Sequence, residues 1–473
     1  MKQQIIGREN EKSMLNSYLQ SDRSEFIAVY GRRRVGKTFL IRNVVEGQEC
    51  FSLTGMENAN MSEQLSNFFF TLHRVYPSAT LPKSWIEAFD ELRSYLESLP
   101  EGRKIIVIDE LPWLDTVRSS FISALEHFWN SWADARNDIK LIVCGSSTSW
   151  MIDNIINNRG GLHNRHTHQI YVAPFTLQES RDYFKAYGFV YGIKEIADCY
   201  MVMGGVAYYY SLMVPEESVA QNIDRLFFKS NSELKNEFSN LYHSLFKKAE
   251  SHIEIVTSLG TKNKGLTRKE ILAHTKLNNN IHFTKVLEEL EKCGFIRSYI
   301  PFDGKKREIL YQLTDAFTLF HFHYVTPNKY QDENFWTNSL NSPRYNTWSG
   351  YSFEILCLNH IKQIKQALGI SGIQSRVCCW QSPPGVGHSG AQIDLLIDRA
   401  DSTVNLCEMK YSNTEYSLTK REYENIENRL NVLLRKTQTK KSVIITLISS
   451  FGMAVNKHSH IVQRQLTLKD LFD

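Results

Sequence analysis

Residues 31–38 read GRRRVGKT, which fits the phosphate-binding pattern G-x-x-x-x-G-K-[ST]. In such a segment the backbone N–H groups curl around phosphate oxygens, and the start of the following helix adds partial positive charge. We expect Lys37 to reach the β- and γ-phosphates of ATP and Thr38 to hold Mg²⁺. The predicted nucleotide site comprises Gly31, Arg32, Arg33, Arg34, Val35, Gly36, Lys37 and Thr38.

Two acids end a second apolar run, IIVIDE at residues 105–110. Asp109 is predicted to contact the Mg²⁺ shell, and Glu110 to orient or deprotonate the attacking water. An acidic strand end is also common on ordinary surfaces. Beside a phosphate loop, however, this pair indicates hydrolysis rather than nucleotide binding alone.

Three further features carry polar groups near this predicted site. Ser146 or Ser147, at the end of LIVCGSS, either senses the γ-phosphate or caps the next helix. Arg165 either acts as an arginine finger, in cis or across the interface of a homo-oligomer, or is a solvated surface residue. The three arginines inside the phosphate loop add positive charge, and solvation is their default state.

A second group of chemically capable residues lies in AQIDLLIDRADSTVNLCEMKYS, residues 391–412. Two apolar strands flank a polar turn, so the start of the first strand adjoins the end of the second. Asp394 lies at that start. Glu408 and Lys410 lie at that end and, being two apart, share one face. The group is either a charged surface end or a Mg²⁺ site in which Asp394 and Glu408 bind the metal and Lys410 stabilises charge.

The elements that must position these residues follow from periodicity. Residues 26–31, 104–110 and 140–147 are continuous apolar runs, as in buried parallel strands, and predict a doubly wound α/β sheet. The predicted domains are an α/β core at 1–170, a helical lid at 171–250, a winged helix-turn-helix at 251–325, a linker at 326–347 and a second α/β domain at 348–473.

The predicted winged helix supports two interpretations. Its candidate recognition helix and the preceding loop carry polar residues suited to a duplex groove: Lys276, Asn278, Asn279, Asn280, His282 and Lys285. The same helix carries Glu288, Glu289 and Glu291, which phosphates repel. The segment is either a nucleic-acid reader or an interdomain packing element.

The order of motifs in the first half resembles the archaeal-type ATPases, from the AAA+-related STAND branch of P-loop ATPases. The motifs are IIGRENEKSML, GRRRVGKT, IDELPWL, CGSS, YVAPFTLQES and MGGVAYYY. This resemblance implies ATP binding, places Gly7 and Arg8 near the adenine, and matches Arg165 to the arginine before the PF strand. Ala207 departs from the family, which usually has a proline after its paired glycines.

The C-terminal part resembles the PD-(D/E)xK nuclease fold. Glu354, on the helix before the hairpin, matches the acidic helix residue, and Asp394 with Glu408-Met409-Lys410 match the Asp and ExK elements. Gln392 stands where an acid is common, and Ile393 replaces the proline. The resemblance implies either Mg²⁺-dependent cutting of nucleic acid, with DNA favoured over RNA, or a catalytically silent nuclease fold.

Composition limits the class of protein. The 473 residues are 42% hydrophobic and 22% charged, with a net charge of +4. This is the balance of a soluble globular chain of two to four domains. The eight cysteines form no CxxC pair, so we expect reduced thiols, no structural zinc and a cytoplasmic location. Because no apolar run is long enough to span a bilayer, no membrane partner is expected.

Overall fold

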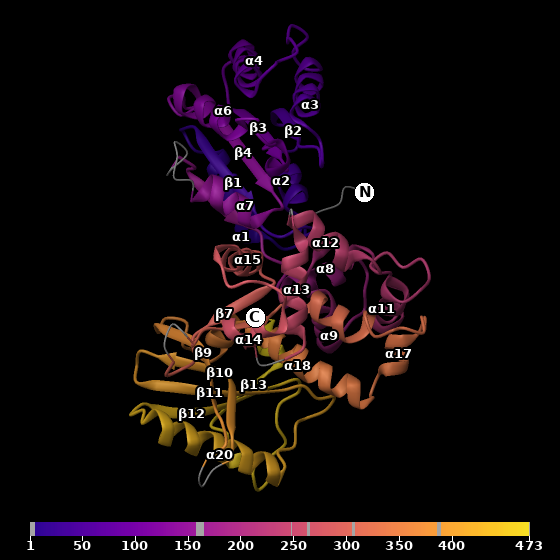
Figure 1. Cartoon of the computed structure of the whole chain (residues 1–473), viewed down its shortest axis with the longest axis vertical. Helices are drawn as coiled ribbons and strands as arrows, with labels where there is room; N and C mark the ends of the chain where they lie inside the picture. The colour runs from indigo at the N-terminus through magenta and orange to yellow at the C-terminus, as the bar shows by residue number, and fades with distance from the viewer. Residues whose placement is uncertain are drawn as a thin grey trace. The chain divides into compact units, whose positions relative to one another are not determined.

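The computed structural model describes residues 5–157, 165–246, 248–262, 265–304, 308–385 and 389–472 (Figure 1). The chain divides into two compact units, Met1–Pro174 (unit 1) and Phe175–Asp473 (unit 2). The four segments predicted to follow the first α/β core therefore share one unit. No helix among the described residues has both the length and the apolar character needed to cross a membrane.

Unit 1 contains a five-stranded sheet in the order β2-β3-β4-β1-β5, in which every neighbouring pair is parallel. The strands are β1 (Glu25–Tyr30), β2 (Glu49–Thr54), β3 (Lys104–Asp109), β4 (Ile139–Gly145) and β5 (His168–Tyr171). The predicted α/β class with a parallel sheet is thus confirmed. Because parallel strands share one carboxyl edge, the segments that follow β1, β3 and β4 meet there.

Helices cover both faces of this sheet because its strands alternate their buried side chains between two cores. Phe26 and Ala28 of β1 face one core, and Ile27 and Val29 face the other. Helices α3 (Met61–His73), α4 (Trp85–Ser98) and α6 (Phe121–Phe128) supply the first core, and α1 (Glu9–Leu19) and α2 (Lys37–Val45) the second. Short helices α5 (Leu111–Leu114) and α7 (Thr148–Met151) follow β3 and β4.

Unit 2 begins with helices, as predicted for residues 171–250. They are α8 (Leu177–Ala186), α9 (Ile193–Met203), α10 (Ala207–Ser211), α11 (Val219–Phe227) and α12 (Glu237–Leu245). Thr176 and Glu179 form a reciprocal capping box at the start of α8. Helix α9 ends at Gly204, whose φ of 64° is the left-handed conformation that glycine adopts readily.

Three helices and three short strands follow. The helices are α13 (Ala249–Gly260), α14 (Arg268–His274) and α15 (Ile281–Lys292), and the strands are β6 (Leu266–Thr267), β7 (Ile296–Tyr299) and β8 (Leu310–Leu313). The strands form an antiparallel sheet in the order β6-β8-β7. Asn280 caps α15 by accepting the N–H of Phe283 at 2.9 Å.

The region predicted as a linker, residues 326–347, is packed and partly helical. It contains α17 (Phe335–Ser339) and the start of α18 (Pro343–Asn359), and follows α16 (Ala316–Phe320). Trp336 is 2% exposed and lies edge-on to Trp348, with ring centroids 5.1 Å apart. The aromatic residues that suggested a connection instead build a core, because large aromatic side chains bury much surface.

The C-terminal part of unit 2 is a mixed five-stranded sheet in the order β13-β12-β11-β10-β9. Strands β9 (Ser375–Ser382), β10 (Ala391–Arg399) and β11 (Thr403–Lys410) are antiparallel, whereas β12 (Ser442–Ser449) and β13 (Arg464–Thr467) run parallel to β11. Helix α18 packs on β11, α20 (Lys420–Thr437) packs on β10, and α19 (Ile361–Ala367) follows α18. Figure 1 shows α20 lying along this sheet.

Gly31→Ala tests the close backbone approach at the start of the phosphate loop. Gly31 has a φ of 149°, and an added Cβ would lie 2.3 Å from the carbonyl oxygen of Val172. Gly102 is a matched control, since its φ is 136° and nothing lies within 4 Å of an added Cβ. We expect Gly31→Ala to lower the free energy of unfolding by about 3 kcal/mol and Gly102→Ala by about 1 kcal/mol in urea titrations. Equal losses would show that the contact with Val172 is unimportant.

Candidate functional site

The side chain of Lys37 points into the carboxyl edge of the unit 1 sheet. Its ammonium group donates to the carbonyl oxygen of Arg32 at 2.9 Å and to Ser146 Oγ at 3.3 Å. Lys37 is 4% exposed, and this burial lowers its pKa, while the nearby acids Glu110 and Asp109 act in the opposite direction. A buried ammonium group at a helix N-terminus is suited to bind an anionic phosphate.

Thr38 and Asp109 meet as predicted for a magnesium site. The Thr38 hydroxyl donates to Asp109 Oδ2 at 2.8 Å, and Asp109 Oδ1 accepts the N–H of Glu110 at 2.9 Å. A hydroxyl and a carboxylate are oxygen ligands of the kind that Mg²⁺ takes beside nucleotide phosphates. These two side chains therefore fit the ion and would hold it against a bound triphosphate.

Glu110 and Ser146 complete this edge of the sheet. The Glu110 carboxylate accepts Ser146 Oγ at 2.6 Å and Ser146 N–H at 3.2 Å, so Ser146 lies between Lys37 and Glu110. Glu110 has a φ of 49°, a strained conformation for a non-glycine residue and one found at functional sites. Ser147 begins α7 without a side-chain capping bond. Of the two serines, the structure thus brings Ser146 to the predicted site.

The arginines are distributed differently from what the sequence suggested. Arg8 is buried, and its Nη2 donates to the carbonyl oxygen of Val35 at 3.2 Å, which places Arg8 and the adjacent Gly7 beside the phosphate loop. Arg32 is buried within the loop, whereas Arg33 and Arg34 are half-buried. The solvated state expected for all three arginines therefore does not hold for Arg32.

Arg165 lies at the opposite edge of the sheet from the phosphate loop. It precedes β5, where Thr167 N–H donates to Phe26 at the start of β1, whereas the loop follows the end of β1. Six strand residues separate the two edges, or about 20 Å. Arg165 is 49% exposed and pairs with Asp134 at 3.3 Å. The predicted cis finger is therefore not assembled here, and a role across a subunit interface stays a prediction.

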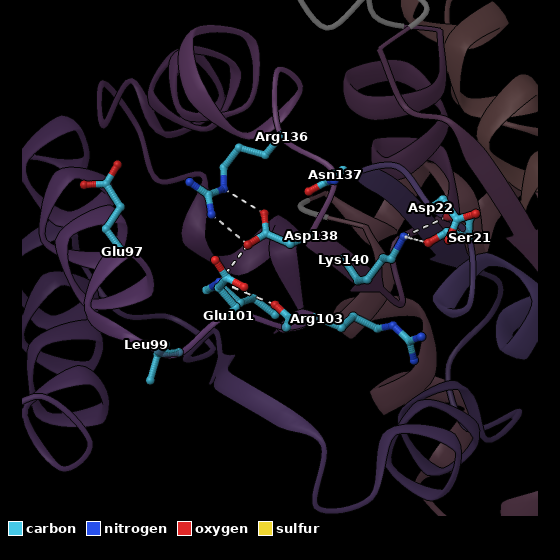
Figure 2. Close-up of a pocket in the computed structure, with 12 residues that line it drawn as sticks. Ser21, Asp22, Glu97, Leu99, Glu101, Arg103, Arg136, Asn137, Asp138 and Lys140 are labelled. Carbon is cyan, nitrogen blue, oxygen red and sulfur yellow. Dashed lines mark hydrogen bonds and ion pairs between the residues drawn. The ribbon is translucent and has the colours of Figure 1, made fainter.

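The edge at which the strands begin, where Arg165 lies, also holds a polar cleft of about 800 Å³ (Figure 2). Arg136 Nε and Nη2 donate to the two carboxylate oxygens of Asp138 at 2.7 Å, and Lys104 donates to Oδ2 at 2.6 Å. Lys140 donates to Ser21 Oγ at 2.7 Å. Because these cations already have partners and the nucleotide loop lies at the other edge, the cleft is a structural ion network and not the nucleotide site.

Asp138→Asn tests this network through its acid sensitivity. Hydrogen bonds from Arg136 and then Lys104 lower the pKa of Asp138 to about 2, below its ordinary value of 3.8. The carboxylate therefore stabilises the fold above pH 4, and this contribution is lost as the pH falls from about 4 toward 2. We expect the substitution to lower the unfolding free energy by about 2 kcal/mol at pH 7 and by much less at pH 2.

Urea titrations at both pH values measure this effect. Asp134→Asn, which removes an exposed ion pair, is the control and should change stability by less than about 1 kcal/mol. A pH-independent loss in Asp138→Asn would show that the network is not electrostatic.

In unit 2, the two strands of the predicted hairpin place Asp394 and Glu408 opposite each other. Leu395 pairs with Cys407 in the β10–β11 ladder, and the next pair outward in this register is Asp394 with Glu408. The β9–β10 ladder is irregular between Ile393 and Leu396, so Asp394 lies at a bulge, a feature that often re-aims a side chain beside an active site.

We define the carboxylate cluster as Glu354, Asp394, Glu408 and Lys410, and polar contacts are found at the last three. Gln392 Nε2 donates to Asp394 Oδ1, and Arg429 Nη1 donates to Glu408 Oε1. Lys410 Nζ lies 4.0 Å from Glu408 Oε2. Gln392, where the nuclease fold commonly has an acid, thus acts here as a donor to Asp394.

Glu354 projects from α18 toward the same charges. Burial, and after it the carboxylate of Asp394, raise the pKa of Glu354 to about 8 even though Lys410 acts to lower it. Glu354 is therefore mostly protonated at neutral pH in the metal-free protein and can donate a hydrogen bond. Such a perturbed acid next to other acids is a typical mark of a functional site.

Two carboxylates of the cluster are placed to bind a metal ion. Among the described residues, no three His, Cys, Asp or Glu side chains lie close enough together to enclose a metal ion. Asp394 and Glu408 offer two facing carboxylates, and Mg²⁺ is commonly held by one or two carboxylates with several waters. These two side chains therefore fit the ion, which when bound would polarise a phosphodiester and lower the pKa of its water.

Two arginines at this site were missed by sequence reasoning. Arg429 lies on α20, and the charges of Glu408 and then Asp394 raise its pKa against the effect of burial. Arg297 on β7 is half-buried, and its Nε donates to Gln312 Oε1 at 2.9 Å. The position of Arg429, on the helix that follows the ExK strand, could have indicated its role. Arg297 gave no such signal, because the cluster residues near it are distant in sequence.

The phosphate loop, the acids at the end of β3 and the serine after β4 give unit 1 an α/β architecture that resembles the P-loop ATPases. Residues 5–212 match the protein family described as an ATPase domain predominantly from Archaea. The N-terminal part of this chain is therefore similar to the ATPase domains of the archaeal type. This confirms the ATPase part of the resemblance, and it supports ATP hydrolysis.

Similar proteins extend over more of the chain. The uncharacterized protein MJECL04 of Methanocaldococcus jannaschii is 24% identical over 432 residues, covering 89% of this chain and 91% of that protein. The Walker-type ATPase paby2304 of Pyrococcus abyssi is 18% identical, with a TM-score of 0.47 over 67% of this chain and 95% of that one. The Aeropyrum pernix ORC2 protein in its ADP form is 14% identical, with a TM-score of 0.36 over 72% and 96%.

Proposed function

We propose that this protein binds and hydrolyses ATP with Mg²⁺, and that its nucleotide state controls a DNA-cutting, Mg²⁺-dependent module formed by the carboxylate cluster. The proposal of ATP hydrolysis rests on one observation: five side chains predicted to act on the nucleotide are linked by hydrogen bonds at one edge of the sheet. They are Lys37, Thr38, Asp109, Glu110 and Ser146. An arginine for the transition state would then come from another subunit, since Arg165 lies at the far edge of its own sheet.

Each residue at the nucleotide site has a distinct role in this proposal. Lys37 and the loop N–H groups bind the β- and γ-phosphates, and Thr38 with Asp109 hold Mg²⁺. Glu110 orients the attacking water and accepts its proton. Ser146 is hydrogen-bonded to both Lys37 and Glu110. A γ-phosphate that binds Lys37 would therefore change the hydrogen bonding of Glu110 through Ser146.

The nuclease part of the proposal rests on the arrangement around Asp394. The mixed sheet with α18 and α20 on it resembles the PD-(D/E)xK fold in the order of its elements, and Asp394 lies across from Glu408 at a bulge. Asp394 and Glu408 would hold Mg²⁺, Lys410 would stabilise charge on the scissile phosphate, and Glu354 would add a further carboxyl group beside them.

A chain of contacts joins the ATPase family domain to this cluster within unit 2. The family match extends to residue 212 and so includes α9, although α9 packs with α18 in unit 2. The Tyr411 hydroxyl donates to Asp198 of α9, and Lys194 donates to the other carboxylate oxygen at 2.9 Å. Because Tyr411 follows Lys410 directly, a shift of α9 displaces the catalytic end of β11.

The experiment compares DNA cleavage in Mg²⁺ without nucleotide, with ATP and with ADP. We expect ATP to change the cleavage rate of the wild type by about fivefold or more. Tyr411→Phe should retain ATP hydrolysis but lose most of this ATP effect, since it removes the hydroxyl bonded to Asp198. Tyr330→Phe, at a 98% exposed position, is the matched control. Cleavage that ignores ATP in the wild type would contradict nucleotide control.

A second candidate function is an ATP-controlled switch that binds DNA through α15 as a winged helix, with a silent nuclease fold. The acids of α15 argue against DNA binding because phosphates repel carboxylates, but two of them already have partners within the protein. Glu289 accepts His252 Nε2 at 2.8 Å, and Glu291 accepts Ser298 Oγ at 2.6 Å. The residues suited to a groove, Lys276, Asn278, Asn279, Asn280, His282 and Lys285, are all exposed.

A further inference from the structure

A cleft of about 700 Å³ lies beside the carboxylate cluster. It is formed by the end of β9, the start of β10 and one face of α20. Its described polar lining includes Gln381, Gln392, Asn425, Asn428 and Arg429. This volume is within the range of sites that hold small ligands.

The cleft shares two side chains with the cluster. Gln392 donates to Asp394, and Arg429 donates to Glu408, so both residues have one side on the cleft and a bond into the cluster. A group seated in the cleft is therefore next to the two carboxylates. If the cluster acts on a phosphodiester, the cleft holds the part of the substrate attached to that phosphate.

The chemistry of the lining favours a nucleobase over a second phosphate. Phosphates are bound chiefly by cations, and Arg429, the cation among the described lining residues, already pairs with Glu408. Four of the other side chains are amides, and each has two N–H donors and an acceptor oxygen, as needed to pair with the edge of a base. Gln392 uses one donor on Asp394, and Asn428 uses one on the Gly390 carbonyl at 3.4 Å, which leaves each a second donor. Asn425 and Asn428 are three residues apart on α20 and so lie on one face.

The remaining described wall is uncharged, and Ser382 is its one polar side chain. Pro383 and Pro384, after β9, line the cleft with ring carbons that suit the flat face of a heterocycle. Amide edges combined with an apolar wall match a base that is free of its complementary strand. A base inside a duplex is paired and stacked, and cannot enter such a cleft unless it is flipped out.

We propose that this cleft binds an unpaired base of single-stranded DNA, and so directs the module to single strands or frayed ends instead of intact duplex. The proposal rests on the proposed function of the carboxylate cluster. It adds the substrate class and names Asn425, Asn428 and Gln381 as the residues that select it.

Binding to the full-length protein in EDTA tests this without cleavage. Fluorescence anisotropy is measured with a labelled single-stranded oligonucleotide, an abasic oligonucleotide of equal length and charge, and the duplex. We expect the single strand to bind about tenfold more tightly than the abasic strand. The double variant Asn425→Ala/Asn428→Ala should lose this difference, whereas Asn431→Ala, an exposed residue on the same helix, should keep it.

The outcomes separate this proposal from the nuclease proposal. Equal affinity for base-bearing and abasic strands in the wild type would overturn the base cleft, as would a double variant that binds like the wild type, even if Lys410-dependent cleavage is found. A base preference that depends on Asn425 and Asn428 would support the cleft even if no DNA is ever cut. Circular dichroism and thermal melting of the double variant establish that it is folded.

Discussion

Lys37→Ala is expected to lower ATP hydrolysis about 100-fold to 1,000-fold. Lys37 is buried, and its ammonium group is already directed at the loop carbonyl of Arg32 and at Ser146, so the charge is held in place before nucleotide arrives. A preorganised charge stabilises negative charge on the transferring phosphoryl group with little rearrangement. Alanine removes this charge and leaves Glu110 and Ser146 without the cation between the base and the phosphates.

The measurement is steady-state phosphate release, with nucleotide affinity measured separately. Lys83→Ala, at an exposed position in the same unit, is the matched control and should hydrolyse ATP like the wild type. Glu110→Gln separates the two steps, because it should retain nucleotide binding while hydrolysis falls, as expected for loss of a general base. Hydrolysis at the wild-type rate by both Lys37→Ala and Glu110→Gln would place the catalytic site elsewhere.

Lys410→Ala is expected to lower Mg²⁺-dependent DNA cleavage by at least about 100-fold. Lys410 lies 4.0 Å from Glu408 and shares a strand face with it, so its ammonium group can reach a phosphate bound at Asp394 and Glu408. Removal of the charge leaves developing negative charge on that phosphate without its nearest lysine. Because Glu408 keeps its bond with Arg429, the fold of this site should survive the substitution.

Cleavage of labelled single-stranded and duplex DNA is followed with Mg²⁺ and with Mn²⁺. Lys440→Ala, an exposed lysine just after α20, is the control for general loss of positive charge. Asp394→Ala should match Lys410→Ala if both act in one reaction. If the wild type and the variants cleave DNA equally, the cleavage does not take place at the carboxylate cluster. If the wild type binds DNA but cuts none, the switch with a silent nuclease fold is the correct function.

Local patterns predicted much of the fold because the residues that determine each element are adjacent in sequence. The apolar runs at residues 104–110 and 140–147 are found as β3 and β4 with the residues that follow them. Strand β2 and the short β6 and β13 were missed, because brief strands with polar residues carry little periodicity. The packed aromatic core around Trp336 was taken for a linker because its contacts join segments that are apart in sequence, such as Trp336 with Phe320 and Trp348.

The sequence by itself determined the phosphate loop, the acids after β3 and the pairing of Asp394 with Glu408, since each depends on spacing within one or two elements. Only the tertiary structure decided which groups meet across elements. It placed Arg165 at the far edge of the sheet, brought Arg429 of α20 to Glu408, and joined Tyr411 to Asp198 of α9. These contacts depend on how helices pack on sheets, and side chains more than twenty residues apart leave no periodic trace of that packing in the sequence.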